Sequence, residues 1–335
     1  MRVAVTRSRG AARDVITIED RPSPEPGAGE VRVQVMSSGV NPSDVKVRAG
    51  AQGPLPADEV MVHNDGAGII DAVGDGVSER RIGEHVWLFN INRSEDGMAQ
   101  GANGTAADQI ICSEDLAAPL PHGVSFDEGA CLGVPAMTAH RAVFADGPVD
   151  GRIVLVTGGA GSVGLLAVQM ASAAGATVIA TVSNDAKSAL ARAAGAALVI
   201  NYRTEDLAAR IVEEFGANSV DRLVDVDFGV HVSLTPQILK RNGVIATYAS
   251  MGAPEPSLPF YQAMFNNTTI RLVFVYAMPD DAKWAAIEDI NAFLRDGALA
   301  PLVAATYPFE QIAEAHEAVE AGGLTGNVVL QIAAG

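Results

Sequence analysis

Residues 154–164 read Val-Leu-Val-Thr-Gly-Gly-Ala-Gly-Ser-Val-Gly, and this stretch decides the fold. It places Gly-x-Gly-x-x-Gly between an apolar strand and a helix, the context in which this motif binds a dinucleotide. The first glycine permits a tight turn, the second lets a diphosphate approach the backbone, and the third lets helix and strand pack closely. The alternative is a glycine-rich turn without a ligand. The residues expected to contact the cofactor here are Gly159, Ala160, Gly161, Ser162, Val163 and Gly164.

A repeating strand–helix pattern surrounds this turn. Apolar strands are expected at residues 153–157, 177–182, 198–201, 222–226 and 243–248, with helices between them. Strands that alternate with helices of this length predict a doubly wound parallel sheet with helices on both faces, a Rossmann domain.

The N-terminal third has a different texture. Val31, Val33 and Val35 alternate with polar residues, which is the period-2 pattern of a half-buried strand. We expect a mostly antiparallel β domain over residues 1–124, completed by residues 302–335, and the dinucleotide-binding domain over 125–301. Residues 92–104 are polar and glycine-rich, so we expect an exposed loop there.

Composition narrows the function. The chain has 335 residues, 40 acidic and 23 basic, for a formal net charge of −17. Such an acidic chain has no electrostatic reason to bind nucleic acid or an anionic membrane. Its two cysteines cannot build a disulfide framework or a thiolate zinc cluster. No secretory signal and no membrane-spanning stretch is visible, so we expect a cytoplasmic protein.

The end of the second parallel strand indicates which dinucleotide binds. NAD sites usually carry a carboxylate there for the ribose 2′-hydroxyl. Here the strand tip offers Ser183, Asn184 and Lys187, which tolerate a 2′-phosphate, with Asp185 close by as a contrary sign. We expect NADPH as the cofactor, with Lys187 pairing with its 2′-phosphate. The alternative is that Lys187 is a solvated lysine on a helix.

Four further segments resemble a known family. They are residues 38–44, 65–74, 133–142 and 313–317, and with the glycine-rich turn they follow the order of the medium-chain dehydrogenase/reductase superfamily. More narrowly, the chain resembles its zinc-free quinone oxidoreductases, the ζ-crystallin-like branch. The resemblance implies a GroES-like N-terminal domain beside the Rossmann domain.

The same resemblance argues against zinc. At the positions where the zinc alcohol dehydrogenases carry their catalytic ligands, this chain has Asn41, Asn64 and Val134. Asp65 alone cannot supply a tetrahedral ligand set, and His63 is offset by one position. We therefore expect no metal site.

Hydride delivery without a metal rests on positioning and hydrogen bonds. The resemblance places Asn41 and Asp44 in the cleft beside the nicotinamide as catalytic residues. Asn41 can donate a hydrogen bond to a substrate oxygen. Asp44 can orient a water or a neighbouring side chain and buffer the proton. The alternative for Asn41-Pro42 is a simple turn.

More cofactor contacts follow from the resemblance. Thr138 is expected at the nicotinamide ribose or amide, with a helix N-cap as its alternative. Asn327 stands where the family commonly has lysine, which removes one phosphate partner. The full set of these weaker assignments is Thr138, Tyr202, Ser250, Phe274, Val275 and Asn327.

The function that these expectations support is NADPH-dependent reduction of a quinone or similar conjugated carbonyl. One alternative is an enone or enal double-bond reductase, which needs a proton donor that the sequence does not reveal. Another is a non-catalytic nucleotide-binding structural or RNA-binding protein. The apolar segment 269–275 resembles the edge strand through which the family dimerises, so a homodimer is expected.

Overall fold

The computed structural model describes residues 1–51 and 53–333, which form two compact units. Unit 1 comprises Met1–Pro135, Tyr276–Pro279 and the chain from Ala300 onward, and unit 2 comprises Ala136–Val275 and Asp280–Leu299. Within the described residues, no helix is long and apolar enough to cross a bilayer.

Unit 1 is built on two β-sheets. Seven strands form one sheet, in which β15 and β16 run parallel and all other neighbours antiparallel, and three strands form a smaller sheet. The strands are β1 (Arg2–Thr6), β2 (Ile16–Asp20), β3 (Glu30–Val40), β4 (Val60–Met61), β5 (Asp65–Val73), β6 (His85–Leu88), β7 (Gln109–Ser113), β8 (Ala117–Pro119), β15 (Val303–Pro308) and β16 (Asn327–Gln331). Its helices are α1 (Ala12–Val15), α2 (Pro42–Ala49), α3 (Phe126–Gly129) and α12 (Ile312–Ala321).

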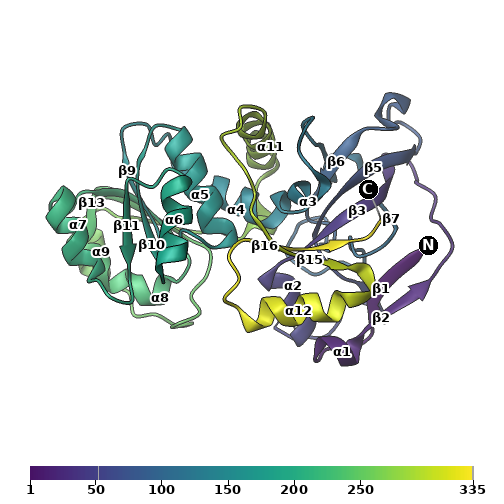
Figure 1. Ribbon diagram of the computed structural model, residues 1–335, viewed down its shortest axis with the longest axis horizontal. Helices are drawn as coiled ribbons and strands as arrows, with labels where there is room; N and C mark the ends of the chain where they lie inside the picture. Colours follow the sequence, from purple (N-terminus) through teal and green to yellow (C-terminus); the bar gives the residue numbers. More distant parts are fainter. Residues whose placement is uncertain (52, 334–335) are drawn as a thin grey trace. The chain divides into compact units, whose positions relative to one another are not determined.

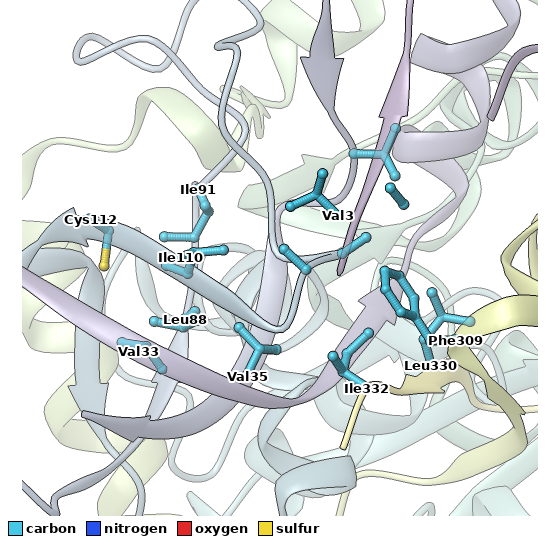
Figure 2. Close-up of a cluster of buried hydrophobic side chains, with 14 of the residues drawn as sticks. Val3, Val33, Val35, Leu88, Ile91, Ile110, Cys112, Phe309, Leu330 and Ile332 are labelled. Atoms are coloured by element: carbon cyan, nitrogen blue, oxygen red, sulfur yellow. The ribbon is translucent and has the colours of Figure 1, made fainter. Parts of the chain in front are cut away.

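The C-terminal segment closes the core of unit 1. Strand β16 pairs with β3 along Val328–Gln331 and Ser37–Val40, so the C-terminal segment joins the larger sheet of unit 1. Figure 2 shows Leu330, Ile332 and Phe309 packed into the same apolar cluster as Val33 and Val35. Burial of these side chains holds the end of β3, and therefore Asn41 that follows it, in a fixed place.

Unit 2 contains a six-stranded, all-parallel sheet in the order β11-β10-β9-β12-β13-β14. Figure 1 shows helices on both sides of this sheet, which confirms the doubly wound Rossmann fold. The strands are β9 (Ile153–Val156), β10 (Thr177–Val182), β11 (Leu198–Asn201), β12 (Val220–Asp225), β13 (Leu239–Thr247) and β14 (Thr269–Leu272). The helices are α4 (Met137–Phe144), α5 (Ser162–Ala173), α6 (Asp185–Ala193), α7 (Leu207–Phe215), α8 (Phe228–His231), α9 (Thr235–Ile238), α10 (Phe260–Phe265) and α11 (Asp280–Arg295).

Two local expectations need correction. The edge strand ends at Leu272 instead of residue 275, and Val275 begins a single 3₁₀ turn. The loop expected to be exposed over residues 92–104 is buried at its start, because the Asn92 amide donates to the carbonyl oxygens of Met61 and Asn103. A polar loop is buried here because its polar groups find backbone partners.

Candidate functional site

The glycine-rich turn has the geometry that phosphate binding requires. Gly158, directly after β9, takes a positive φ of 64° that favours glycine. A Cβ at Gly164 would lie 2.2 Å from the Gly158 carbonyl oxygen, whereas a Cβ at Gly161 would come no closer than 3.3 Å to a neighbour. Gly164 therefore allows close packing, and exposed Gly161 leaves the backbone open to a ligand.

Helix α5 presents its N-terminus to this opening. Its N-cap is Gly161, which has no side chain that could accept from the first-turn amides. Backbone N–H groups at a helix N-terminus bind phosphate through hydrogen bonds and the helix dipole. The residues here therefore fit a nicotinamide dinucleotide, with Ala160 buried beneath the turn and Ser162 and Val163 half-buried in the first turn of α5.

Other predicted cofactor residues lie at the same edge of the sheet. Tyr202 follows β11, and its N–H donates to the Val182 carbonyl oxygen at 3.1 Å, beside Ser183. Asn184 is the N-cap of α6, and its Oδ1 accepts from the Lys187 N–H at 2.9 Å. Ser250, after β13, accepts from the Gly229 N–H at 3.0 Å and donates to Ala253.

The remaining predicted cofactor residues are more scattered. Thr138 is buried in the first turn of α4, whose N-cap is Ala136, so its alternative role as an N-cap is wrong. Phe274 is 43% exposed and Val275 is buried, both beyond the end of β14. Asn327 belongs to unit 1, where its amide donates to the Leu302 carbonyl oxygen at 3.2 Å.

The start of α2 in unit 1 holds both predicted catalytic residues. Asn41 is the N-cap and Asp44 is the N3 residue, whose Oδ2 accepts from the Asn41 N–H at 2.9 Å. This is a capping box with proline in the first turn, so Asn41-Pro42 begins a helix and is not a simple turn.

Asn41 and Asp44 each contact one residue of the neighbouring segment 64–65. Asn41 Nδ2 donates to Asp65 Oδ2 at 2.7 Å, and Asn64 Nδ2 donates to Asp44 Oδ1 at 2.7 Å. The N–H of Val134 donates to the same Asp65 oxygen at 2.8 Å. All four polar residues are at most 6% exposed, so these hydrogen bonds operate at low dielectric.

The two carboxyl groups of this network hold protons more tightly than ordinary carboxyls. Burial, and next the charge of Asp44, raises the pKa of Asp65 well above its usual value. Burial also raises the pKa of Asp44. Asp65 Oδ1 has no hydrogen-bond partner among the described residues, so it is the oxygen free to carry a proton.

Arg93 and Tyr276 complete the surroundings of this pair. The Arg93 guanidinium lies 3.5 Å from the centroid of the Tyr276 ring, and its charge lowers the pKa of both Asp44 and Asp65. Tyr276 Oη hydrogen-bonds to Ser43 Oγ at 2.7 Å. The sequence did not indicate either residue. Arg93 lies in the segment 92–104, for which the sequence predicts an exposed loop.

His63 forms a second buried network behind Asp65. It is 1% exposed with a positive φ of 77°, and its Nε2 lies 2.8 Å from Nε2 of His316 on α12. Its Nδ1 lies 2.9 Å from Ser38 Oγ, which contacts Thr105 Oγ1 at 2.7 Å. Burial lowers the pKa of His63 to about 3 and that of His316 well below its usual value.

The hydroxyl contacts fix the tautomers of the two histidines. Thr105 donates its only hydroxyl proton to the Asp65 carbonyl oxygen at 2.6 Å, so Ser38 donates to Thr105. Ser38 then accepts from Nδ1–H of His63, whose Nε2 accepts from Nε2–H of His316. This series of hydrogen bonds ends at the backbone carbonyl oxygen of Asp65 and helps to hold that residue in place.

The donor set at this place does not fit zinc. The side chains at the ligand positions are two carboxamides and a valine, and Asn41 and Val134 both donate to the one carboxylate. Zinc needs thiolate, imidazole or carboxylate ligands that converge on one point. Over residues 1–51 and 53–333, no group of three or more His, Cys, Asp or Glu side chains is arranged to hold a metal.

Comparisons with known proteins agree with both units. Residues 27–122 match the family model for the alcohol dehydrogenase GroES-like domain, and residues 162–292 match the model for zinc-binding dehydrogenases. A quinone oxidoreductase from Homo sapiens is 30% identical over 309 residues, which cover 92% of this chain and 90% of that protein.

Solved structures show the same fold. A crystal structure of an NAD-dependent alcohol dehydrogenase has a TM-score of 0.87 and 30% identity, covering 99% of this chain and 100% of that one. A mycobacterial protein complexed with NADPH has a TM-score of 0.81 and 26% identity, covering 99% and 100%. The chain is therefore a nicotinamide-dependent oxidoreductase that belongs to the quinone oxidoreductase branch of the medium-chain dehydrogenase/reductase superfamily.

Proposed function

We propose that this enzyme transfers hydride from NADPH to a quinone or a similar conjugated carbonyl without zinc. The observation that supports the proposal is the Asn41–Asp65 hydrogen bond, because it engages a neutral amide at a position that the resemblance matches to a zinc ligand of the alcohol dehydrogenases. A quinone needs no Lewis acid, because it is electrophilic and its reduced form is a stabilised aromatic anion. The family relationship to a human quinone oxidoreductase supports the same substrate class.

The bound nicotinamide supplies a hydride from its C4 atom, and the protein arranges what receives it. Asn41 Nδ2 carries two hydrogens and gives one to Asp65. The other is available to a substrate oxygen, on which negative charge develops as the hydride arrives. Asp65 acts as a positioning residue that fixes the Asn41 amide. One proton from solvent completes the hydroquinone, with Asp44 as the proposed buffer beside it.

The preference for NADPH is proposed because residues 183 and 184, at the tip of β10, carry no carboxylate; Asp185, the first residue of α6, is the contrary sign. Ser183, Asn184 and Lys187 stand there, and exposed Asn184 is occupied as a helix cap. Lys187 is half-buried on α6, within the first turn, where a cation can meet a 2′-phosphate. Fluorescence titration of Lys187→Met should weaken NADPH binding and leave NADH binding unchanged. Equal loss for both would refute the assignment.

The test of the reaction is oxidation of NADPH by purified enzyme with a quinone acceptor, compared with an alkyl enone. We expect faster turnover of the quinone. The enone reaction remains the second candidate, because Asp65 carries a raised pKa and an unpartnered oxygen, the features of a proton donor. A higher kcat/KM with the enone would favour that candidate. The non-catalytic alternative is not retained for a member of this enzyme family.

We propose that two copies associate through β14. Strand β14 pairs only with β13 among the described residues, and Leu272 on it is 76% exposed. On neighbouring α10, Phe260, Tyr261 and Phe265 are each more than half exposed. An open apolar edge is a hazard unless it is covered, and a second copy would cover it. Light scattering should give twice the chain mass, and Leu272→Lys should give the monomer.

A further inference from the structure

A cavity of about 330 Å³ lies in unit 2 on the edge of the sheet away from the glycine-rich turn. The turn follows the carboxyl end of β9, whereas the cavity is bordered by residues 146–152, which precede β9, and by the first residues of β12. Its volume falls within the range of small-molecule sites. No proposed cofactor residue lines it.

The lining of this cavity is cationic. Arg152, Arg222, Lys240 and Arg241 face only two carboxylates, Asp146 and Asp221, a surplus of two positive charges. The carboxylates are already engaged, since Asp221 pairs with Arg152 and Lys240, and Asp146 binds Arg271. The chain as a whole carries a formal charge of −17, so a cluster of positively charged side chains is not what its overall composition predicts.

Arg222 is the unusual member of this set. It is 5% exposed, it forms no ion pair with any described carboxylate, and its Nε has no hydrogen-bond partner among the described residues. Its one hydrogen bond there is a 3.3 Å contact from Nη1 to the Gly147 carbonyl oxygen. Burial lowers the pKa of Arg222, the charge of nearby Asp146 raises it in part, and the charges of Arg271 and Arg152 lower it further. The nearby carboxylate, Asp146, is already paired with Arg271, so Arg222 is a buried guanidinium without an ion pair of its own, and an anion that fills the cavity would stabilise it.

From this arrangement we infer a second ligand site, distinct from the cofactor site, that binds the phosphate group of a small phosphorylated metabolite. The planar guanidinium of Arg222 can donate to two phosphate oxygens from the floor of the cavity, and Arg241 can approach from the solvent side. The cavity is larger than a bare phosphate ion requires, so the ester carbon chain also fits. This site is separate from the proposed site of hydride transfer. Binding of a ligand to it is therefore measured as an increase in the thermal stability of the protein.

The test measures Tm as inorganic phosphate, glycerol 3-phosphate or chloride is added at constant ionic strength, with saturating NADPH to block the cofactor site. Ligand at about ten times its Kd should raise Tm by on the order of 3 °C. Arg222→Met should abolish that shift without lowering Tm in chloride, because it replaces a buried charge by an apolar side chain. Arg241→Met, at an exposed position, should weaken the shift even if Arg222→Met does not fold.

The matched control is Arg192→Met, which removes the same charge from an exposed position of α6 that does not line the cavity. It should respond to ligand like the unmodified protein. Equal shifts in all variants, or no shift with either phosphate compound, would overturn the site. A shift with inorganic phosphate that the ester does not reproduce would overturn the assignment to a phosphorylated metabolite.

Discussion

Nδ2 of Asn41 donates a 2.7 Å hydrogen bond to Oδ2 of Asp65, between the N-cap of α2 and the first residue of β5. Both side chains are at most 4% exposed, so their relative orientation is fixed by packing and by this bond. The arrangement joins a neutral amide donor to a buried carboxyl group. Loss of either side chain would leave the other as a buried polar group without this partner, which is costly.

Removal of the Asn41 amide should slow the chemical step. Asn41→Ala is expected to lower kcat for quinone reduction about 10²-fold, the usual effect of deleting one oxyanion donor. The KM for NADPH should not change. Steady-state kinetics with Ser23→Ala, at an exposed position outside the proposed site, provide the control. An unchanged kcat would show that Asn41 does not donate to the substrate.

Replacement of Asp65 should separate stability from activity. The folded-state pKa of Asp65 is raised, so the wild-type carboxyl favours folding at low pH and loses that contribution as pH rises above about 4. Asp65→Asn removes this loss, by about 1.4 kcal/mol for each unit of pKa shift. Urea unfolding should therefore show that the free energy of unfolding of the variant increases relative to that of the wild type as pH rises. The kcat of the variant should be lower than that of the wild type. A difference in free energy of unfolding that does not change with pH would contradict this.

The His63–His316 pair should make the protein sensitive to acid. Both histidines have lowered pKa values in the folded state, so the unfolded chain binds more protons once pH falls below about 6.5. Stability should decline from there down to about pH 3, the folded-state pKa of His63. Urea unfolding of His316→Gln should show a shallower decline. Exposed His122→Gln is the control and should retain the wild-type slope.

Two glycines of the turn should respond differently to alanine. In Gly161→Ala the new Cβ meets only the Gly158 oxygen at 3.3 Å, so the fold should persist. NADPH affinity should fall, because the methyl group would take up space that we propose for the diphosphate. In Gly164→Ala the Cβ would come within 2.2 Å of that oxygen, so both Tm and affinity should fall. Titration and thermal unfolding of both variants distinguish the two roles. Tight NADPH binding by Gly161→Ala would place the diphosphate elsewhere.

The parallel sheet and its phosphate-binding turn could be predicted because both depend on local patterns. Gly159 to Gly164 and the strands around them carry a periodicity that the neighbouring residues alone explain. The catalytic roles of Asn41 and Asp44 rest on the resemblance and stay a prediction, whereas the capping box that these residues form is visible in the spacing of Asn41, Pro42 and Asp44.

The rest of the site depends on contacts between distant segments. Arg93 and Tyr276 are 183 positions apart, and nothing in the sequence indicates that the guanidinium stacks on the ring. The pairing of His63 with His316 likewise arises only when α12 packs in unit 1. The raised pKa of Asp65 follows from burial, which residue type and spacing do not reveal.

The most direct measurement is the initial rate of NADPH oxidation with a quinone by enzyme dialysed against a strong chelator. Turnover equal to that of untreated enzyme, unchanged when zinc is added back, is the predicted result. Loss of turnover that zinc restores would contradict a site in which Asn41 takes the place of a metal ligand.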